Sequence, residues 1–151
     1  MHKRLIDVCK FKEHLITIKP NATIDEAVYH LNKHKIGCLI VIKDTNIVGI
    51  ISERDILNKL GTTDIENNIH HVKVSEIMTP KEKLIVGHPE DTVEYLMNLM
   101  HDKEIRHIPL VNDEGKLVCL TSIRDLIRIL LKDSNSRVKH LSNYVQGKYP
   151  A

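Results

Sequence analysis

Two four-residue stretches of the chain carry the same chemical groups. Ser52-Glu53-Arg54-Asp55 and Ser122-Ile123-Arg124-Asp125 both read Ser-x-Arg-Asp, and each directly follows an apolar run. A helix that begins there points unpaired backbone N–H groups and a partial positive charge outward, which favours phosphate or another anion. The arginine adds permanent positive charge, and the aspartate offers two acceptor oxygens that suit a vicinal diol such as ribose. Phosphate and ribose together indicate a nucleotide.

The same stretches also have a purely structural interpretation. Ser-x-x-Asp at the start of a helix is an ordinary N-cap with a favourable acid in the first turn. A single occurrence favours the cap. Two occurrences at equivalent places of a repeat make the purely structural interpretation weaker. They do not exclude it, because a helix cap could itself have been duplicated.

Internal repetition relates the two stretches. With a shift of about 69 residues the first half of the chain falls on the second, with one inserted residue in a turn. Because the match is this long, the repeat has to be interpreted before any single motif is interpreted. The matched pairs include Leu15 with Leu84, Pro20 with Pro89, Thr23 with Thr92, Ile36 with Ile105, Asp44 with Asp113, Val48 with Val118 and Ser52 with Ser122.

Each copy predicts a strand, a helix, a hairpin and a second helix. The first helix begins with a capping box, Thr23-x-x-Glu26 in one copy and Asp91-x-x-Glu94 in the other, and continues with helical spacing of apolar residues. Two β-branched runs around a polar turn then predict the hairpin. The predicted strands cover residues 15–18, 38–42 and 47–51, then 84–86, 107–111 and 117–121. The predicted fold class is therefore α/β, built from two βαββα repeats.

The segments outside the repeats are predicted to be helical or irregular. A short helix from Val74 should stop at Pro80. After Leu131 the polar run 133–136 predicts an interruption, beyond which Val138, Leu141, Tyr144 and Val145 lie on one helical face that needs a partner. We expect an N-terminal helical segment (1–13), repeat 1 (14–60), a linker (61–73), repeat 2 (74–132) and a C-terminal helix with tail (133–151).

Composition excludes several classes of protein. The 151 residues are 42% hydrophobic, which is enough for a core. With 22 basic and 20 acidic residues the net charge is +2, and this balance and the few aromatics disfavour nucleic-acid binding. No run approaches the roughly 18 apolar residues of a membrane helix. Cys9, Cys38 and Cys119 are odd in number and widely spaced, so neither a disulfide framework nor a zinc site is predicted. We expect a cytoplasmic protein.

Two further groups of residues suggest metal binding or catalysis. His70-His71 and the spacing His101-x-x-Glu104-x-x-His107 invite a metal, but no second cluster completes a coordination shell. Ser52 or Cys38 could serve as a nucleophile, but neither has a base partner at local spacing. We therefore expect no metal site, no catalytic cofactor and no enzymatic activity.

The chain resembles the paired cystathionine β-synthase-type (CBS) domain, the tandem called a Bateman module. The resemblance covers residues 15–131 and the linker residues 77–80, and its motifs are Gly49–Asp55, Ile105–Val111 and Leu120–Leu126. It is most similar to small stand-alone bacterial members, which also carry a C-terminal helix. The resemblance implies two repeats related by a pseudo-twofold axis, with clefts that bind AMP, ADP, ATP, NAD or S-adenosylmethionine.

The resemblance also implies that each cleft is built from both repeats. The aspartate of one repeat would hold the ribose, while the other repeat would supply contacts to adenine and phosphate. The first cleft would combine Ser52, Arg54, Asp55, Ile85, Val86, Arg106 and His107. The second cleft would combine Thr17, Ile18, Ile36, Gly37, Cys38, Ser122, Arg124 and Asp125.

The two clefts are not expected to be equivalent. Arg106-His107 and Gly49 favour the first cleft as the better phosphate site, because Gly37-Cys38 replaces the basic pair in the second and Cys119 replaces the glycine. The resemblance implies a non-enzymatic adenine-nucleotide sensor of energy or redox state, which forms a homodimer and signals to an effector protein. The alternative is a structural or protein-interaction module whose ligand sites are vestigial.

Overall fold

The computed structural model describes Leu5, Cys9, residues 15–62 and residues 68–145. The first repeat contains β1 (Thr17–Ile18), α2 (Ile24–His34), β2 (Cys38–Lys43), β3 (Asn46–Ser52) and α3 (Glu53–Thr62). The connection contains the 3-10 turn η1 (Ile69–His71), α4 (Val74–Ile77), β4 (Thr79–Pro80) and the 3-10 turn η2 (Lys81–Lys83). The second repeat contains α5 (Val93–Asp102), β5 (His107–Val111), β6 (Leu117–Ser122) and α6 (Ile123–Val145).

The duplication extends to backbone detail. Lys35 and Glu104, which are equivalent positions, both take the left-handed conformation, with φ of 52° and 53°. Each hairpin has its register shift at the same place, between Val41 and Ile42 in one and between Leu110 and Val111 in the other. The predicted α/β fold with two repeats is confirmed.

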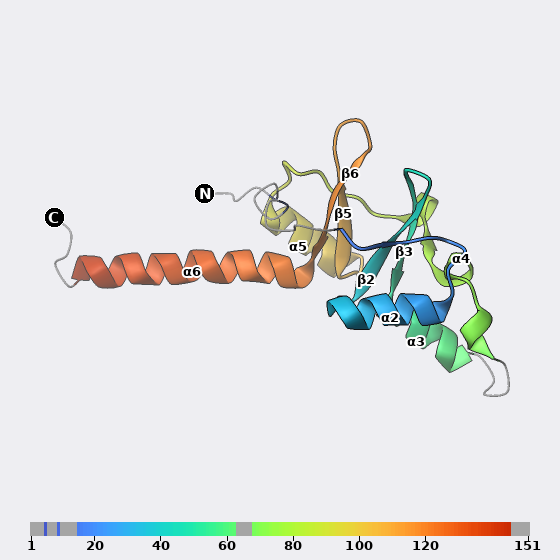
Figure 1. Ribbon diagram of the computed structural model, residues 1–151. Helices are drawn as coiled ribbons and strands as arrows, with labels where there is room; N and C mark the ends of the chain where they lie inside the picture. The colour runs from blue at the N-terminus through green and yellow to red at the C-terminus, as the bar shows by residue number, and fades with distance from the viewer. Residues whose placement is uncertain (1–4, 6–8, 10–14, 63–67, 146–151) are drawn as a thin grey trace.

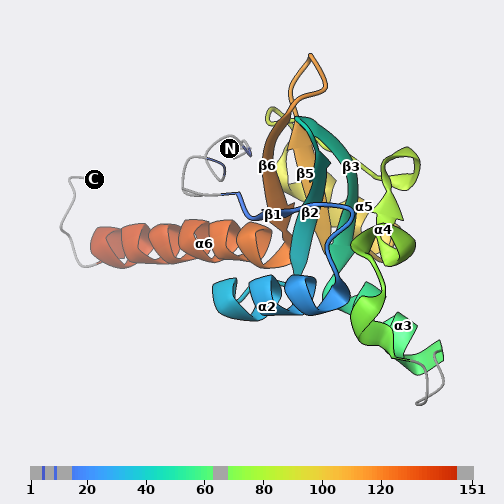
Figure 2. The ribbon, with the colours of Figure 1, turned by 45° about the vertical axis from the view of Figure 1, so that its right-hand side comes forward.

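The strands form a four-stranded sheet in the order β1-β2-β3-β4 and a two-stranded sheet of β5 and β6. Figure 2 shows the hairpins β2–β3 and β5–β6 next to each other, and Figure 1 shows α3 and α6 leaving from the same end of both. The two serine-containing junctions therefore face each other across the contact between the repeats.

The predicted strand at 84–86 is wrong, because pairing there is reduced to one bridge between Gly87 and Leu110. The Gly87 N–H donates to the Pro109 carbonyl at 2.9 Å, and the Val111 N–H donates to the Gly87 carbonyl at 2.9 Å. To extend this parallel pairing back to Ile85, residue 109 would have to donate an N–H. Proline has none, so the strand ends there.

Three apolar clusters build a layered core. One cluster packs α2 and α3 on the first sheet through Leu39, Val41 and Ile51, and another packs α5 and α6 on the second sheet. The third lies between the sheets, where Ile40 and Ile50 meet Leu117 and Leu120. Because alternate residues of β2 point to opposite faces, this strand contributes to both its own repeat and the contact between repeats.

Helix α6 is continuous, so the predicted interruption at 133–136 is wrong. None of those residues is glycine or proline, and Asp, Ser and Asn cost only a few tenths of a kcal/mol each in a helix. The ion pair between Arg137 and Asp133, at 3.2 Å, spans the same turn. Figure 1 shows α6 running far beyond the strands. The predicted apolar stripe consists of Val138, Leu141, Tyr144 and Val145, whose side chains are not among those that the structure describes. Among the described helices, none is long and apolar enough to cross a membrane.

One capping box is confirmed, and the other, Asp91-x-x-Glu94, is wrong, because the helix is capped one residue later by Thr92 alone. The Thr23 N–H donates to Glu26 Oε2 at 2.9 Å, and the Glu26 N–H donates to Thr23 Oγ1 at 3.3 Å. In the second repeat Thr92 is the cap and accepts from the Tyr95 N–H at 3.1 Å. The Asp91 carboxylate instead accepts from the His88 N–H at 2.7 Å, in the preceding turn.

A disulfide joins Cys9 to Cys119, whereas the number and spacing of the cysteines predicted no disulfide framework. The two residues are 110 positions apart in the sequence, and their Cα atoms are 5.7 Å apart. Only the fold brings them together, so spacing could not reveal the pair. Of the N-terminal segment predicted at 1–13, Leu5 and Cys9 are described, and the other residues lie outside the described part.

Gly49 tests the packing of β3 against β4. A Cβ at this position would lie 2.6 Å from the Thr79 carbonyl oxygen and 2.8 Å from Met78 Sδ, whereas a Cβ at Gly61 would meet nothing within 4 Å. We expect Gly49→Ala to lower the free energy of unfolding by about 1–3 kcal/mol, and Gly61→Ala, in the last turn of α3, to leave it unchanged or raise it by up to about 1 kcal/mol. Urea denaturation followed by circular dichroism measures both, and equal stabilities would contradict this packing.

Candidate functional site

Both Ser-x-Arg-Asp stretches form closed N-caps. Asp55 Oδ2 accepts from the Ser52 N–H at 2.8 Å and from Ser52 Oγ at 3.0 Å, and the Asp55 N–H donates to Ser52 Oγ at 3.3 Å. The corresponding distances at Ser122 and Asp125 are 2.8, 2.8 and 3.2 Å. The structural interpretation of the motif is therefore correct. It also means that each carboxylate is held in a defined orientation at the junction of a strand and a helix.

Each cap is tied to the residue that precedes the neighbouring strand. The Glu53 N–H donates to the Gly37 carbonyl at 3.0 Å, and the Ile123 N–H donates to the Arg106 carbonyl at 2.9 Å. Strand pairing continues this contact, because Cys38 lies opposite Ser52 and His107 lies opposite Ser122. The start of one strand and the start of the following helix thus form one rigid corner in each repeat.

A cavity of about 220 Å³ opens at the first corner. The fold brings most of the predicted first cleft together around it, and Val86 lies outside with 47% of its surface exposed. The predicted residues that line the cavity are Ser52, Arg54, Asp55, Ile85, Arg106 and His107. Sequence reasoning missed Lys83, Glu104 and Thr79, which come from the connection and from the turn before β5.

A cavity of about 960 Å³ opens at the second corner. The predicted residues that line it are Ile36, Gly37, Cys38, Ser122, Arg124 and Asp125. Thr17 and Ile18 do not, and they line a separate cavity on the other side of repeat 1. Leu15 and Ile16 take their place. The repeat itself explains the error, because a shift of 69 residues puts Ile85 on Ile16 and not on Ile18.

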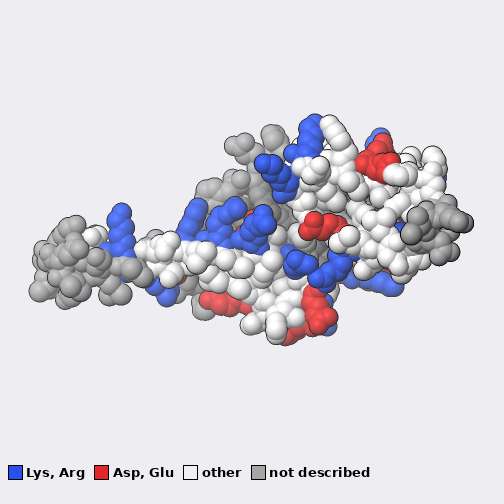
Figure 3. Space-filling model, turned by 90° about the horizontal axis from the view of Figure 1, so that it is seen from below, with Lys and Arg blue, Asp and Glu red and all other residues white. Residues whose placement is uncertain are grey.

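The second cavity carries more positive charge than the first. Its lining has four permanent cations and two carboxylates, whereas the first has three of each. Sequence reasoning missed Lys35 and Arg128, although Arg128 follows Arg124 by one helical turn. Figure 3 shows Lys and Arg side chains gathered along the part of α6 nearest the body. The described cations of the second cavity are Lys35, Arg106, Arg124 and Arg128.

The two cavities share a wall. Gly37, Cys38, Glu53, Arg106 and His107 line both of them. The expectation that the first cleft binds phosphate better depended on Arg106 and His107. Since both residues reach both cavities, they do not distinguish the clefts.

Cys38 has no activated thiol. Burial raises the pKa of Cys38 far above its ordinary value, and the negative charge of Asp55 raises it further. The side chain is 2% exposed. Because the thiolate is the reactive form, a thiol in this environment is a poor nucleophile.

His70, in the connection, makes a hydrogen bond to Asp25 of α2. His70 Nδ1 lies 2.7 Å from Asp25 Oδ1, which joins the connection to α2. Within the ranges that the structure describes, no three His, Cys, Asp or Glu side chains are grouped so that they could hold a metal ion.

Comparison with protein families identifies both halves of the chain. The model of the CBS domain matches residues 7–62 and 74–132. The mitochondrial CBS domain-containing protein CBSX3 of Arabidopsis thaliana is 36% identical over 84% of this chain, which spans 62% of that protein. The CBS domain-containing protein YhcV of Bacillus subtilis is 31% identical over 73% of this chain and 74% of its own length.

Solved structures share the fold over nearly their whole length. The CBS domain pair of protein MJ0100, in complex with 5′-methylthioadenosine and S-adenosyl-L-methionine, is 25% identical and aligns with a TM-score of 0.75 over 88% of this chain and 99% of its own. CBSX2 in complex with AMP is 25% identical and aligns with a TM-score of 0.71 over 87% of this chain and 98% of its own.

The protected thiol of Cys38 gives a direct test of the corner geometry. We expect iodoacetamide at about pH 8 to alkylate Cys38 in the unfolded, unreduced protein at least about 100-fold faster than in the native protein, because the native thiol stays protonated. Asp55→Asn should leave the native reaction slow, since burial is the larger cause of the raised pKa. Mass spectrometry of timed samples measures the rates, and rapid native alkylation would show that the corner is open.

Proposed function

This chain belongs to the CBS-domain family as a tandem CBS pair, and on that basis we propose that it is a regulatory module that binds AMP, ADP, ATP or NAD between its repeats. The observation that carries the proposal is the pair of Ser–Asp caps, each at the edge of a cavity lined by basic side chains from both repeats. Two relatives bind adenosine-containing ligands, which supports the same ligand class here.

Each part of an adenine nucleotide has a matching group in the second cavity. The Asp125 carboxylate would accept hydrogen bonds from the ribose hydroxyls, and the guanidinium groups of Arg124 and Arg128 would hold phosphate. Apolar side chains such as Ile16 and Ile36 would cover the adenine.

We assign the second cavity as the principal site. Its volume of about 960 Å³ lies within the range of about 300–1,000 Å³ that is usual for small-molecule pockets. The first cavity, at about 220 Å³, is below that range. The larger positive charge of the second cavity supports the same assignment.

The proposed mechanism is non-enzymatic. A ligand that contacts both repeats favours the arrangement in which both sets of contacts are made, and so shifts their relative packing. An effector protein or a second copy of the chain would respond to this shift.

We also propose a cytoplasmic location. This location makes the disulfide unusual, because a reducing compartment normally keeps thiols reduced.

Replacing the ribose-binding acids tests the proposal. We expect Asp125→Ala to weaken AMP binding at the principal site by roughly ten- to a hundredfold, because a hydrogen bond to a charged group contributes about 1.5–3 kcal/mol. Asp55→Ala should have the same effect at the first cavity only. Isothermal titration calorimetry with AMP and NAD measures both.

Asp91→Ala is the matched control. Asp91 also accepts a hydrogen bond from a backbone N–H three residues earlier, but it lines neither cavity. Its replacement should lower the stability somewhat and leave the affinity for AMP unchanged.

The proposal would be contradicted if the unaltered protein bound none of AMP, ADP, ATP and NAD. That result would favour the alternative, an interaction module with vestigial sites, which also predicts no thermal shift with any of these ligands.

We propose a homodimer, supported by large apolar side chains that remain exposed on α6. Leu130 and Leu131 are 37% and 58% exposed, and exposed apolar patches mark contact surfaces. We expect light scattering after gel filtration to give twice the chain mass for the unaltered protein and a monomer for Leu130→Glu/Leu131→Glu. Tyr95→Glu, at a comparably exposed position on α5, should remain dimeric. A monomeric unaltered protein would refute the dimer.

A further inference from the structure

We propose that reduction of the Cys9–Cys119 disulfide weakens ligand binding in the second cavity, so that the protein reads the thiol redox state together with the nucleotide. This inference rests on the proposed function, because it concerns regulation of the same site. It requires that the disulfide supports the Ser122–Asp125 corner and that the other corner has no such support.

The internal repeat explains where the disulfide lies. A shift of 69 residues places Leu5 on Val74 and Cys9 on Met78, and the later shift of 70 places Gly49 on Cys119. In repeat 1, Met78 lies against Gly49, since a Cβ there would be 2.8 Å from Met78 Sδ. The corresponding pair in repeat 2 is Cys9 with Cys119. The disulfide thus replaces a methionine–glycine contact at the same place in the fold.

The backbone of the two lead-in segments is also equivalent. The Cys9 N–H donates to the Leu5 carbonyl at 3.2 Å, as the Met78 N–H donates to the Val74 carbonyl at 2.9 Å. Leu5 and Val74 are both fully buried, Leu5 in the repeat 2 cluster and Val74 in the repeat 1 cluster. Each repeat is therefore supported by the segment that precedes the other repeat.

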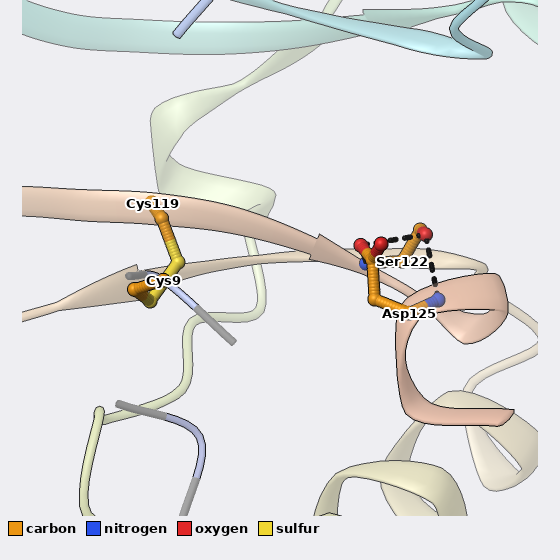
Figure 4. Close-up of a disulfide and its surroundings, with 4 residues drawn as sticks. All are labelled: Cys9, Cys119, Ser122 and Asp125. Carbon is orange, nitrogen blue, oxygen red and sulfur yellow. Dashed lines mark hydrogen bonds between the residues drawn. A yellow bond between two sulfur atoms is a disulfide. The ribbon is translucent and has the colours of Figure 1, made fainter. Parts of the chain in front are cut away.

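Strand β6 connects the disulfide to the ligand corner. Figure 4 shows Cys119 on the same strand that leads to Ser122 and Asp125. Cys119 and Thr121 are buried toward the core of repeat 2, whereas Leu120 and Ser122 line the second cavity. A change at Cys119 is therefore three residues along a single strand from the cap.

One packing contact and the chain itself connect the N-terminal segment to the second cavity. Leu5 packs in the same cluster as Leu126, the residue that follows Asp125. In the other direction along the chain, Leu15 and Ile16 line the cavity and follow Cys9 by only a few residues. Release of Cys9 would loosen the core behind the cap and the apolar wall in front of it.

The first corner has no equivalent redox support. Behind Ser52, the cluster packs through Ile51, Ile56 and Val74. The remaining cysteine, Cys38, is a free thiol that packs between the sheets. Reduction should therefore leave the first cavity unchanged.

The chemistry is exchange with a dithiol. A thiolate of the reductant attacks Sγ of the half-buried Cys9, and Cys119 leaves as a thiolate that takes up a proton. The second thiol of the reductant then releases Cys9 and closes its own disulfide. The dithiol gives up two electrons and two protons, and each cysteine gains one of each.

The test compares AMP binding by the oxidised full chain with binding by the same protein reduced with dithiothreitol. Alkylation in denaturant, followed by mass spectrometry, should count one thiol in the oxidised protein and three in the reduced protein. We expect reduction to lower Tm by about 5–15 °C and to weaken AMP binding about five- to twentyfold. The affinity change should persist in Asp55→Ala, which keeps the second cavity, and vanish in Asp125→Ala.

Cys9→Met/Cys119→Gly is the matched control, because it places the repeat 1 pair in repeat 2. This variant should fold and bind AMP with the same affinity with and without dithiothreitol. Three thiols in the protein before reduction, or equal affinities of the oxidised and reduced protein, would overturn the inference. A redox-dependent Tm without binding of AMP, ADP, ATP or NAD in either state would instead overturn the proposed function.

Discussion

The hydrogen bonds between Ser and Asp at the end of each hairpin determine how the rest of the molecule can be arranged. In both repeats the strand passes into a helix without an intervening loop, so the first-turn N–H groups need local acceptors. The aspartate and serine satisfy part of this need, and the next N–H bonds to the residue before the neighbouring strand. Helix direction, strand register and the position of a carboxylate follow from this one corner.

Duplication of the corner creates the candidate site. Because the third apolar cluster holds the two sheets together, the two corners come close enough to share Arg106 and His107. The repeats differ where a single residue changes the available contacts. Pro109 removes a donor and shortens a strand, and Cys119 in place of glycine allows a covalent link.

Much of this arrangement was predictable from the sequence, because it depends on local chemistry repeated twice. The hairpins, the Thr23–Glu26 box and both helix starts follow from turn residues, capping patterns and apolar periodicity. Most of the residues that the resemblance to CBS pairs implied for each cleft line the corresponding cavity. Thr17 and Ile18 do not line the second cavity because the internal repeat places Ile85 on Ile16, two residues before Ile18.

Other features depend on contacts between distant segments and leave little trace in sequence. The disulfide needs the N-terminal segment to pack on repeat 2. The continuity of α6 depends on small differences in helix propensity, and the role of Lys35 depends on the approach of α6. Arg128 is the exception, since its helical spacing from Arg124 was visible.

The wall shared by the two cavities has a thermodynamic consequence. If both cavities hold anionic ligands, the ligands draw on the same Arg106 and His107, so the first to bind reduces the positive potential available to the second. Such a coupling is reciprocal, and its size is the same whichever cavity fills first. Occupancy would then rise over a wider range of ligand concentration than it would for the same two sites without this coupling. The protein would respond to its ligand in a graded manner.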